Sequence, residues 1–509
     1  MRLAVALAFL AAAVQAGVIQ GEILEQASGR PLARTIVRLE PVPGQTTATV
    51  RPLQLRANGT GHFVFPSVPS GLYLLKVQRE GYSPAAYGQR RATGQGTPIQ
   101  VTPHSDLFAE FRMRRMGAIS GRVLDENGIG LPGITVLAYR ARLPLRSIAN
   151  GKSDDRGVYR IAGLDPGKYW IRTAAALLDD GSGLLPTFGP LSRETRDARI
   201  QTVNLDEEAQ DANVQPEQGS LFRLSGKVLC DRTSDPPAMV TVTLSSETGK
   251  RSTRVVCGSL APYVMEGLAP GPYEILASYE DLGGFGFVEL SLDHDSELGN
   301  VQLMKAPLVD FEFRNAGDKS VVSAPITVMG RRDDLSGNDL PVKIATPRAT
   351  MAPGHWEMNA ITPPGQYVQS IVNQFRQPVR PWRVERPAEW QDVFVEQRAP
   401  ARIQVLVSDQ AGRISGTVTA AGASIPAAPV FLWPVAEAAM RSLGGTHQIL
   451  ADTQGHFEFA SLPPGDYRVL ATFDYSQVDL DIFEEAHAPS IKVAAAQNAA
   501  IELPLWVAP

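Results

Sequence analysis

The stretch DRGVYRIAGLDPGKY, residues 155–169, gives the strongest indication of how the chain folds. It begins with a glycine-containing turn and continues as a segment in which the apolar residues Tyr159 and Ile161 flank a charged one. Alternation with a period of two is typical of a half-buried β-strand. Pro-Gly then favours a second tight turn, because proline presets φ and glycine allows a positive φ. The stretch predicts two strands joined by a turn, with Tyr169 pointing inward and its hydroxyl bonded to a nearby backbone group.

The same pattern recurs along the 509 residues. In three other copies, an aromatic residue again precedes the tyrosine after the turn by ten positions: Phe63 and Tyr73, Tyr263 and Tyr273, Phe457 and Tyr467. A degenerate fourth copy is interpreted with Trp356 and Tyr367, eleven apart. The tyrosines predicted to be equivalent are Tyr73, Tyr169, Tyr273, Tyr367 and Tyr467, with successive separations of 96, 104, 94 and 100 residues. A period of this size indicates a tandem array of structural repeats.

A second motif, of the form Ile-x-Gly-x-Val, precedes four of these blocks by roughly fifty residues. Its alternation predicts a first strand with the glycine on the inward face. A missing side chain there allows a facing backbone or ring to approach closely, or marks a bulge. The glycines are Gly21, Gly121, Gly226 and Gly416, and the fourth copy has residues 309–313 in this place without a glycine.

Together these motifs resemble the carboxypeptidase regulatory-like domain. The frame is Ile-Ser-Gly-x-Val, then Asp-x-x-Gly-x-Tyr, then Leu-x-Pro-Gly-x-Tyr; copies one, two and five match it well. Copy three lacks the Asp-x-x-Gly turn. The resemblance implies a seven-stranded, transthyretin-like sandwich, grouped with carbohydrate-binding-like folds, that carries no catalytic residue in metallocarboxypeptidases. The tandem layout is similar to that of repeat proteins exported by bacteria.

The predicted fold class is therefore all-β, a tandem array of about five Greek-key, transthyretin-like or Ig-like β-sandwich modules of about seven strands each. The expected modules are residues 17–115, 116–219, 220–305, 306–409 (degenerate) and 410–509, after a segment 1–16. We expect each module to have its own core and modest interfaces with its neighbours. The acidic junction 206–219 is expected to be flexible, and a short helix is expected around 435–443.

Residues 1–16 are typical of a secretory signal peptide, cleaved after Ala16. The apolar run from Leu3 to Val14 is too short to span a bilayer, and no later stretch predicts a transmembrane anchor. The formal charge of −5 argues against nucleic-acid binding, which needs a basic surface. We therefore expect a secreted or periplasmic protein whose partner is a protein or a polysaccharide of the cell envelope.

The sequence offers little chemistry for catalysis. One His-x-x-Glu pair, His294 and Glu297, lies where a sandwich needs an exposed turn. Nucleophile-elbow, zinc-protease and phosphate-loop motifs do not occur. His62 and His456 share a repeat position that is expected to be solvated. We predict no catalytic residue, no metal ligand and no cofactor.

Two features leave alternatives open. Trp382, Trp390, Tyr82 and Tyr87 lie in loop-like segments, where they either contact a neighbouring module or form a platform for a sugar ring. Cys230 and Cys257 lie in the same module, so export favours a disulfide between them; two free buried thiols are the alternative. The preferred function is a non-catalytic spacer and interaction scaffold. The first alternative is a carbohydrate-binding protein that uses exposed aromatic residues. The less favoured alternative is an accessory or catalytic part of a zinc carboxypeptidase.

Overall fold

The computed structural model describes residues 16–46, 51–142, 145–230, 238–333, 340–373, 389–397 and 401–509. Nearly all of the regular structure is β-strand, paired into small sheets, so the all-β prediction is confirmed. The predicted signal peptide lies outside the described residues, apart from Ala16.

The described strands fall into five consecutive groups, which we name modules 1 to 5. In module 1, one sheet has the order β4-β1-β8 and faces a second of order β3-β2-β5-β6, in which β7 also pairs with β5. Module 1 contains β1 (Gly17–Glu25), β2 (Ile36–Thr46), β3 (Leu53–Arg56), β4 (His62–Val68), β5 (Gly71–Gln78), β6 (Ala85–Ala86), β7 (Ile99–Val101) and β8 (Asp106–Met113).

Modules 2 and 3 repeat this plan with an extra short strand each. Module 2 contains β9 (Gly117–Arg122), β10 (Thr135–Arg140), β11 (Ser147–Lys152), β12 (Val158–Leu164), β13 (Gly167–Thr173), β14 (Ala176–Leu177), β15 (Gly183–Leu184), β16 (Gln201–Val203) and β17 (Glu208–Ala209). Module 3 contains β18 (Phe222–Gly226), β19 (Val228–Leu229), β20 (Met239–Ser246), β21 (Gly249–Val256), β22 (Tyr263–Leu268), β23 (Gly271–Tyr279), β24 (Gly284–Leu292), β25 (Val301–Gln302) and β26 (Met304–Lys305).

Modules 4 and 5 complete the chain, and both α-helices lie in module 5, the first where a helix was expected. Module 4 contains β27 (Leu308–Asn315), β28 (Thr327–Arg332), β29 (Val342–Ile344), β30 (Arg348–Thr350), β31 (Gly354–Ile361), β32 (Tyr367–Asn373), β33 (Gln391–Val395) and β34 (Ala401–Ser408). Module 5 contains β35 (Gly412–Ala420), β36 (Ala423–Ser424), β37 (Pro429–Pro434), α1 (Glu437–Leu443), β38 (His447–Leu450), β39 (His456–Leu462), β40 (Gly465–Ala471), α2 (Leu480–Glu485), β41 (Ser490–Val493) and β42 (Asn498–Pro504).

Each module buries one apolar core between its two sheets. In β1 every second residue is buried, as expected for a strand with one face on the core. In modules 1, 2, 4 and 5 the first strand also pairs in parallel with the last, as β1 does with β8 and β35 with β42. In module 3 the second strand, β19, pairs in parallel with β25, and Leu224 of β18 forms a parallel bridge with Ser296. This pairing ties the two ends of each module together.

The glycine of the first strand leaves room for that parallel neighbour. A Cβ atom at Gly21 would lie 1.9 Å from the carbonyl oxygen of Ala109, and one at Gly416 would lie 1.9 Å from that of Ile501. Gly121 and Gly226 face the same kind of contact, with backbone atoms of the last segment 2.3 and 2.1 Å from the Cβ position. Any side chain here would push the first and last strands of the module apart.

Four of the five tyrosines after the turn occupy one equivalent position. Their rings are buried, and each hydroxyl donates to the carbonyl oxygen four residues earlier, at 2.5–2.9 Å. Burial raises the pKa of each phenol, to about 12 for two of them. The four are Tyr73, Tyr169, Tyr273 and Tyr467, and the two with a pKa of about 12 are Tyr169 and Tyr273.

In module 4 this position belongs to Trp356, so the prediction for Tyr367 is wrong. Trp356 follows Pro353-Gly354, is buried, and donates from its indole nitrogen to the carbonyl oxygen of Ala352, four residues earlier, at 2.9 Å. Its strand β31 pairs with β28 and β33, as β13 pairs with β10 and β16 in module 2. Tyr367 is partly exposed and begins β32, which joins the opposite sheet. The segment between β31 and β33 is thus an insertion with its own Pro-Gly turn.

The acidic junction 206–219 is part of the module 2 sandwich and not a flexible linker. Its strand β17 runs parallel to β9, and Val214 forms a parallel bridge with Val123. Ala212 and Val214 are buried in the core of the module. The acidic and glutamine side chains of this segment are the outward-facing residues of a last strand, which explains why the composition resembled that of a linker.

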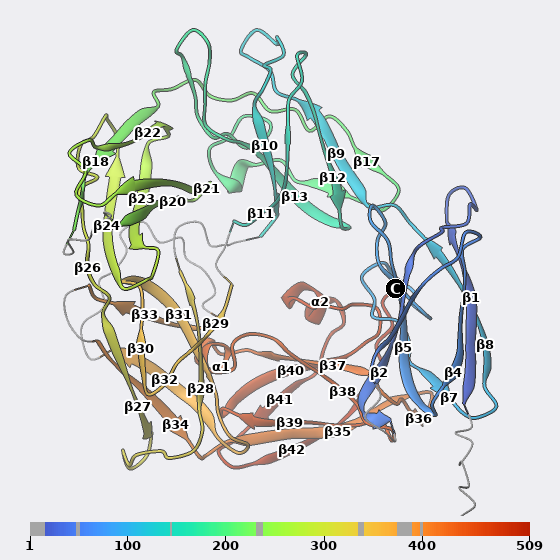
Figure 1. Ribbon diagram of the computed structural model, residues 1–509. Coiled ribbons are helices and arrows are strands. Elements are labelled where there is room, and N and C mark those ends of the chain that lie inside the picture. Colours follow the sequence, from blue (N-terminus) through green and yellow to red (C-terminus); the bar gives the residue numbers. More distant parts are fainter. Residues whose placement is uncertain are drawn as a thin grey trace, which may run out of the picture.

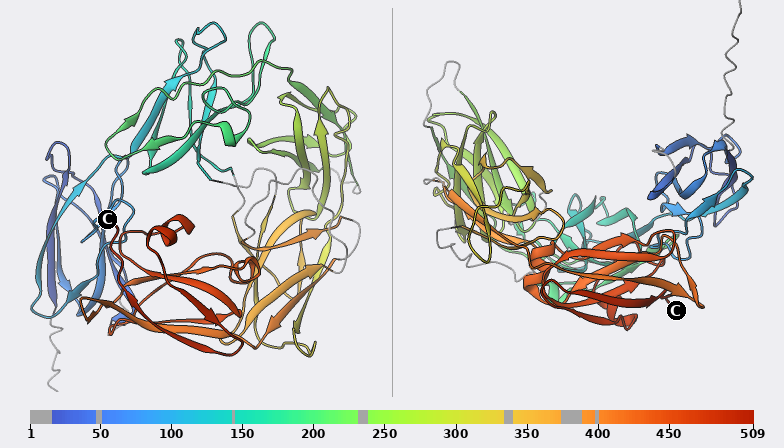
Figure 2. Two further views of the ribbon diagram at one scale, coloured as in Figure 1. Left: turned by 180° about the vertical axis from the view of Figure 1, so that it is seen from behind. Right: turned by 90° about the horizontal axis from the view of Figure 1, so that it is seen from below.

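The five modules follow one another around a closed ring (Figure 1). Module 5 returns to module 1, so the C-terminal residues lie beside the first module. Figure 2 shows that the ring is bent: seen from below, modules 1 and 3 both stand away from module 5 toward the same side. The array is therefore closed through direct contact of its first and last modules, an arrangement that the repeat pattern did not predict.

Candidate functional site

The ring closes where residues 90–95 of module 1 meet residues 473–476 of module 5; we call these two segments the latch. The backbone amide of Gln95 donates to the carbonyl oxygen of Phe473 at 3.0 Å. In the opposite direction, the backbone amide of Ser476 donates to the carbonyl oxygen of Thr93 at 2.6 Å. Two backbone segments that donate to each other in this way resemble a short antiparallel strand pair.

Opposite charges face each other across the latch. The guanidinium of Arg90 lies 4.0 Å from the carboxylate of Asp474, whose side chain is almost fully buried. Arg91 lies over the ring of Tyr475, with 5.9 Å between the guanidinium carbon and the ring centroid, and donates a hydrogen bond to the carbonyl oxygen of Pro509. Module 1 thus supplies the cations, and module 5 supplies a carboxylate, an aromatic face and a carbonyl oxygen.

Residues 506–509 hold the module 5 side of the latch in place. The indole of Trp506 stacks on the ring of Tyr475, with 6.0 Å between centroids and 10° between planes. The amide of Ala508 donates to the carboxylate of Asp474 at 2.8 Å. These contacts orient the two side chains that the arginines of module 1 reach.

A small apolar cluster lies beside the polar contacts. Val42 and Leu72 of module 1 and Ala427 of module 5 are buried against one another, with Leu74 and Leu450 packed around them. Burial of apolar surface between the modules stabilises the closed ring. The cluster is small compared with the module cores, so opening the latch costs less than unfolding a module.

The joint between modules 1 and 2 is fixed by a buried carboxylate, Glu25. It accepts hydrogen bonds from the Ser28 hydroxyl, from the Tyr82 hydroxyl at 2.9 Å and from the Arg115 guanidinium at 2.7 Å. These donors, with Ser28 contributing most, lower the pKa of Glu25 to about 2. The amide of Arg115 also donates to the Asp206 carboxylate of module 2 at 2.7 Å. Arg115, at the connection between the two modules, is therefore held by Glu25 of module 1 and by Asp206 of module 2.

The remaining joints also carry direct contacts between modules. Gln397 of module 4 donates to two carbonyl oxygens of module 3, at 3.1 and 2.8 Å. Gly365 of module 4 donates from its amide to the Ser461 hydroxyl of module 5 at 3.0 Å. Arg172 of module 2 lies 3.8 Å from Glu247 of module 3. Each neighbouring pair is thus docked as well as linked by the chain.

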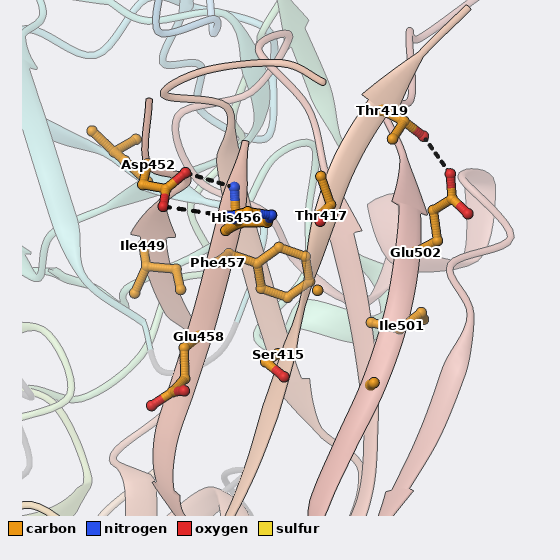
Figure 3. A pocket seen from close by; sticks show the side chains of 13 residues that line it. Ser415, Thr417, Thr419, Ile449, Asp452, His456, Phe457, Glu458, Ile501 and Glu502 are labelled. Carbon is orange, nitrogen blue, oxygen red and sulfur yellow. Dashed lines mark hydrogen bonds and ion pairs between the residues drawn. The ribbon is translucent and has the colours of Figure 1, made fainter. Parts of the chain in front are cut away.

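A second candidate site is an open groove of about 1040 Å³ on the outer face of the sheet formed by β39, β35 and β42 (Figure 3). Ser415, Thr417 and Thr419 belong to the central strand, β35, and line the groove. Glu458 and Glu502 project from the strands on either side (Figure 3). Short hydroxyl side chains between longer carboxylates make a polar trough.

The groove has polar groups but no catalytic arrangement among its described residues. Ser415 donates to the amide oxygen of Asn498 at 3.2 Å, and not to a base. The ring of His456 lies 3.6 Å from the carboxylate of Asp452, which also accepts two backbone amides of its own turn. The one aromatic lining residue, Phe457, is buried. The groove offers hydrogen bonds to a polar ligand, but its described lining contains no exposed phenylalanine, tyrosine or tryptophan ring for stacking on a sugar.

The described part of the chain contains no group of three or more histidine, cysteine, aspartate or glutamate side chains placed to hold a metal ion. His294 is exposed, and its ring nitrogen pairs with the neighbouring Asp293.

Three of the four aromatic residues considered as a sugar platform lie in the described part of the chain, and each is engaged by other residues of the protein. Tyr82 lies at the joint between modules 1 and 2, with the guanidinium carbons of Arg79 and Arg115 at 5.8 and 5.7 Å from its ring centroid. Tyr87 packs against the core of module 1. Trp390, in module 4, lies under the guanidinium of Arg331, at 5.1 Å, and against module 5. Trp382 lies outside the described residues.

Cys230 and Cys257 are joined in a disulfide in module 3, with 5.9 Å between their Cα atoms. The two cysteines are 27 residues apart in the sequence. Both side chains pack against the module 3 core.

The latch was not predicted from the sequence. Its residues lie in loops outside the repeated motifs, between β6 and β7 and after β40. The signal that could have indicated it is a pair of adjacent arginines, Arg90 and Arg91, in a loop that the sandwich does not need.

Residues 118–179, in module 2, match the family model of the carboxypeptidase regulatory-like domain. The predicted resemblance is therefore confirmed for this module. Among curated proteins, no sequence matches this chain.

Similar solved structures include three bacterial proteins. The minor pilin of Streptococcus agalactiae is 12% identical, and the match covers 40% of this chain and 97% of that chain, with a TM-score of 0.25. The Bacillus anthracis TIE protein is 11% identical, with coverage of 92% and 74% and a TM-score of 0.17. The major pilin SpaD from Corynebacterium diphtheriae is 9% identical, with coverage of 57% and 98% and a TM-score of 0.17.

Proposed function

We propose that this protein is an exported, non-catalytic interaction scaffold, in which five β-sandwich modules are held in a closed ring and present binding surfaces at fixed relative positions. The observation that carries this proposal is the latch. A chain that served as a flexible spacer would need no contact between its first and last modules. Here backbone hydrogen bonds, charge pairs and an apolar cluster fix those modules to each other.

Export is supported by the disulfide of module 3. Disulfides persist in oxidising compartments outside the cytoplasm, and Cys230 and Cys257 are placed to form one. The apolar segment that precedes module 1 is typical of a signal peptide. In the described residues, neither α-helix is long or apolar enough to cross a bilayer.

The partner is proposed to be a protein or a polysaccharide of the cell envelope. Carbohydrate binding through exposed aromatic residues has less support, because Tyr82, Tyr87 and Trp390 are each engaged within or between modules. A zinc carboxypeptidase role has less support still, because the one His-x-x-Glu pair is at an exposed turn.

The test compares the native chain with an opened ring. A Cβ atom at Gly94 would lie 2.8 Å from the carbonyl oxygen of Phe473, so Gly94→Ala should separate the latch. Gly59→Ala, in the same module, is the matched control, since a Cβ atom there meets nothing within 4 Å. Small-angle X-ray scattering should show a compact ring for the native chain and the control, and a larger radius of gyration for Gly94→Ala.

Binding to envelope polysaccharides and envelope proteins is then measured for the three chains. Stronger binding by the native chain and the Gly59→Ala control than by Gly94→Ala would support a scaffold that needs the closed ring to hold its binding surfaces in place. A native chain as extended as Gly94→Ala would contradict the proposal, and so would turnover of a peptide or glycan substrate by the purified protein.

A further inference from the structure

We propose that the latch is an exchangeable interface, through which module 1 of one copy docks on module 5 of a second copy to form a closed dimer with two latches. This inference rests on the ring closure proposed above. The two halves of the latch belong to one chain but are far apart in it: the Thr93 hydroxyl bonds a carbonyl oxygen 381 residues away. The contacts themselves would be the same if the two halves came from different chains.

An opened ring exposes groups that need partners. The amide of Gln95 and the carbonyl oxygen of Thr93 lose their bonds, as does the carbonyl oxygen of Phe473. Unpaired backbone donors and acceptors at a strand-like edge favour pairing with another chain. The apolar residues Val42 and Leu72 become exposed at the same time. Each opened chain therefore carries two surfaces that complement each other.

Charge decides which surfaces meet. Arg90 and Arg91 lie on the module 1 side, and Asp474 lies on the module 5 side. Two module 1 surfaces would bring four guanidinium groups together, and two module 5 surfaces would bring two carboxylates together. Like charges disfavour both of these pairings, so the surfaces pair as unlike halves.

Pairing of unlike halves gives a heterologous interface, which either closes on itself or continues into further copies. Within one chain, closure is favoured because the two halves are linked, and their effective concentration is set by the geometry of the modules between them. A second copy competes when its own concentration approaches that value. A dimer that exchanges the halves reciprocally satisfies both latches and leaves no open end.

The test uses added cysteines at two exposed latch positions and a short bismaleimide crosslinker. A chain with both Ala92→Cys and Ser476→Cys reports closure within one copy. A mixture of two chains, one with Ala92→Cys and one with Ser476→Cys, reports exchange, because crosslinking them requires two copies. A mixture of Thr60→Cys and Ser476→Cys measures random collisions, since Thr60 is exposed in module 1 and outside the latch.

We expect the double variant to give a crosslinked monomer, and the latch mixture to give a crosslinked dimer at least fivefold above the Thr60 control as the protein concentration rises. A crosslinked monomer without excess dimer would overturn the exchange but leave the ring in place. Failure of the double variant to crosslink would overturn the ring and the exchange together. Adding Gly94→Ala to every chain should abolish both crosslinks, whereas Gly59→Ala should change neither.

Discussion

The hydroxyl of Thr93 donates a 3.1 Å hydrogen bond to the carbonyl oxygen of Asp474, 381 residues further along the chain. This bond joins the first module of the protein to the last. Together with the Gln95 amide and the two arginines, it converts a linear array of sandwiches into a ring. The four docked joints bring the first and last modules together, and this small contact region closes the ring, which makes it the most informative place to perturb.

The ring of Trp506 should be needed for a tight latch. Trp506→Ala removes the stack on Tyr475 that places this ring under Arg91. Hydrogen–deuterium exchange of the Gln95 amide should rise severalfold, because this amide donates to the carbonyl oxygen of Phe473 in module 5. Val507→Ala, at an exposed neighbouring side chain, is the control and should leave exchange unchanged. Equal protection in the two variants would show that the tail does not support the latch.

The buried tyrosine hydroxyls should each stabilise their own module. Tyr169→Phe removes the hydroxyl and leaves the carbonyl oxygen of Asp165 without this donor. The expected loss is about 1 kcal/mol, and Tyr169→Ala should cost about 3–5 kcal/mol because it also leaves a cavity. Local stability is measured by native-state hydrogen exchange of β13. Tyr367→Phe, at a partly exposed ring in module 4, should have no comparable effect on its own strand.

The Cys230–Cys257 disulfide should stabilise module 3 in the exported protein. Closing a loop of this length gives about 3–4 kcal/mol in the chain-entropy model. A Cys230→Ser, Cys257→Ser double variant should therefore lower the unfolding midpoint of module 3 and leave module 5 unchanged. Thiol titration of the unreduced, denatured native protein should find no free thiol. Two free thiols would show that both cysteines are small core residues and that no bond forms.

The joint between modules 1 and 2 should weaken in acid. The pKa of Glu25 is lowered from 4.5 to about 2 by its hydrogen-bond donors. The folded state therefore favours the ionised carboxylate, and its contribution is complete above pH 4.5 and is lost as pH falls through about 2. Glu25→Gln should melt earlier than the native chain at pH 7, and the difference in melting temperature should shrink between pH 4.5 and 2. A difference that stays constant across this range would contradict the assignment.

Much of each module could be predicted from the sequence, because its determinants are local. Turn chemistry and period-two alternation act over a few residues, so the frame around Gly121 and Tyr169 indicated the sandwich directly. In module 4 the sequence pattern predicted the wrong anchoring residue, because two Pro-Gly pairs compete for the same place in the repeat. Pro353-Gly354 and Pro364-Gly365 are each followed two residues later by an aromatic residue. The repeat period favoured the second of these aromatic residues, Tyr367, as the buried anchor. In the structure the anchor is the first, Trp356, because its strand pairs with β28.

The repeat, the all-β class and the position of most turns follow from the pattern of residues along the chain. The aromatic residue that anchors module 4, the way the modules sit on one another and the closure of the ring become apparent only in the folded molecule. The two sets of features differ in the range of the interactions that specify them. A strand and its turns are specified by residues within about ten positions of each other, whereas a latch is specified by the shape of four intervening joints. Arg91 and Tyr475 carry no pattern that links them until the chain between them has folded.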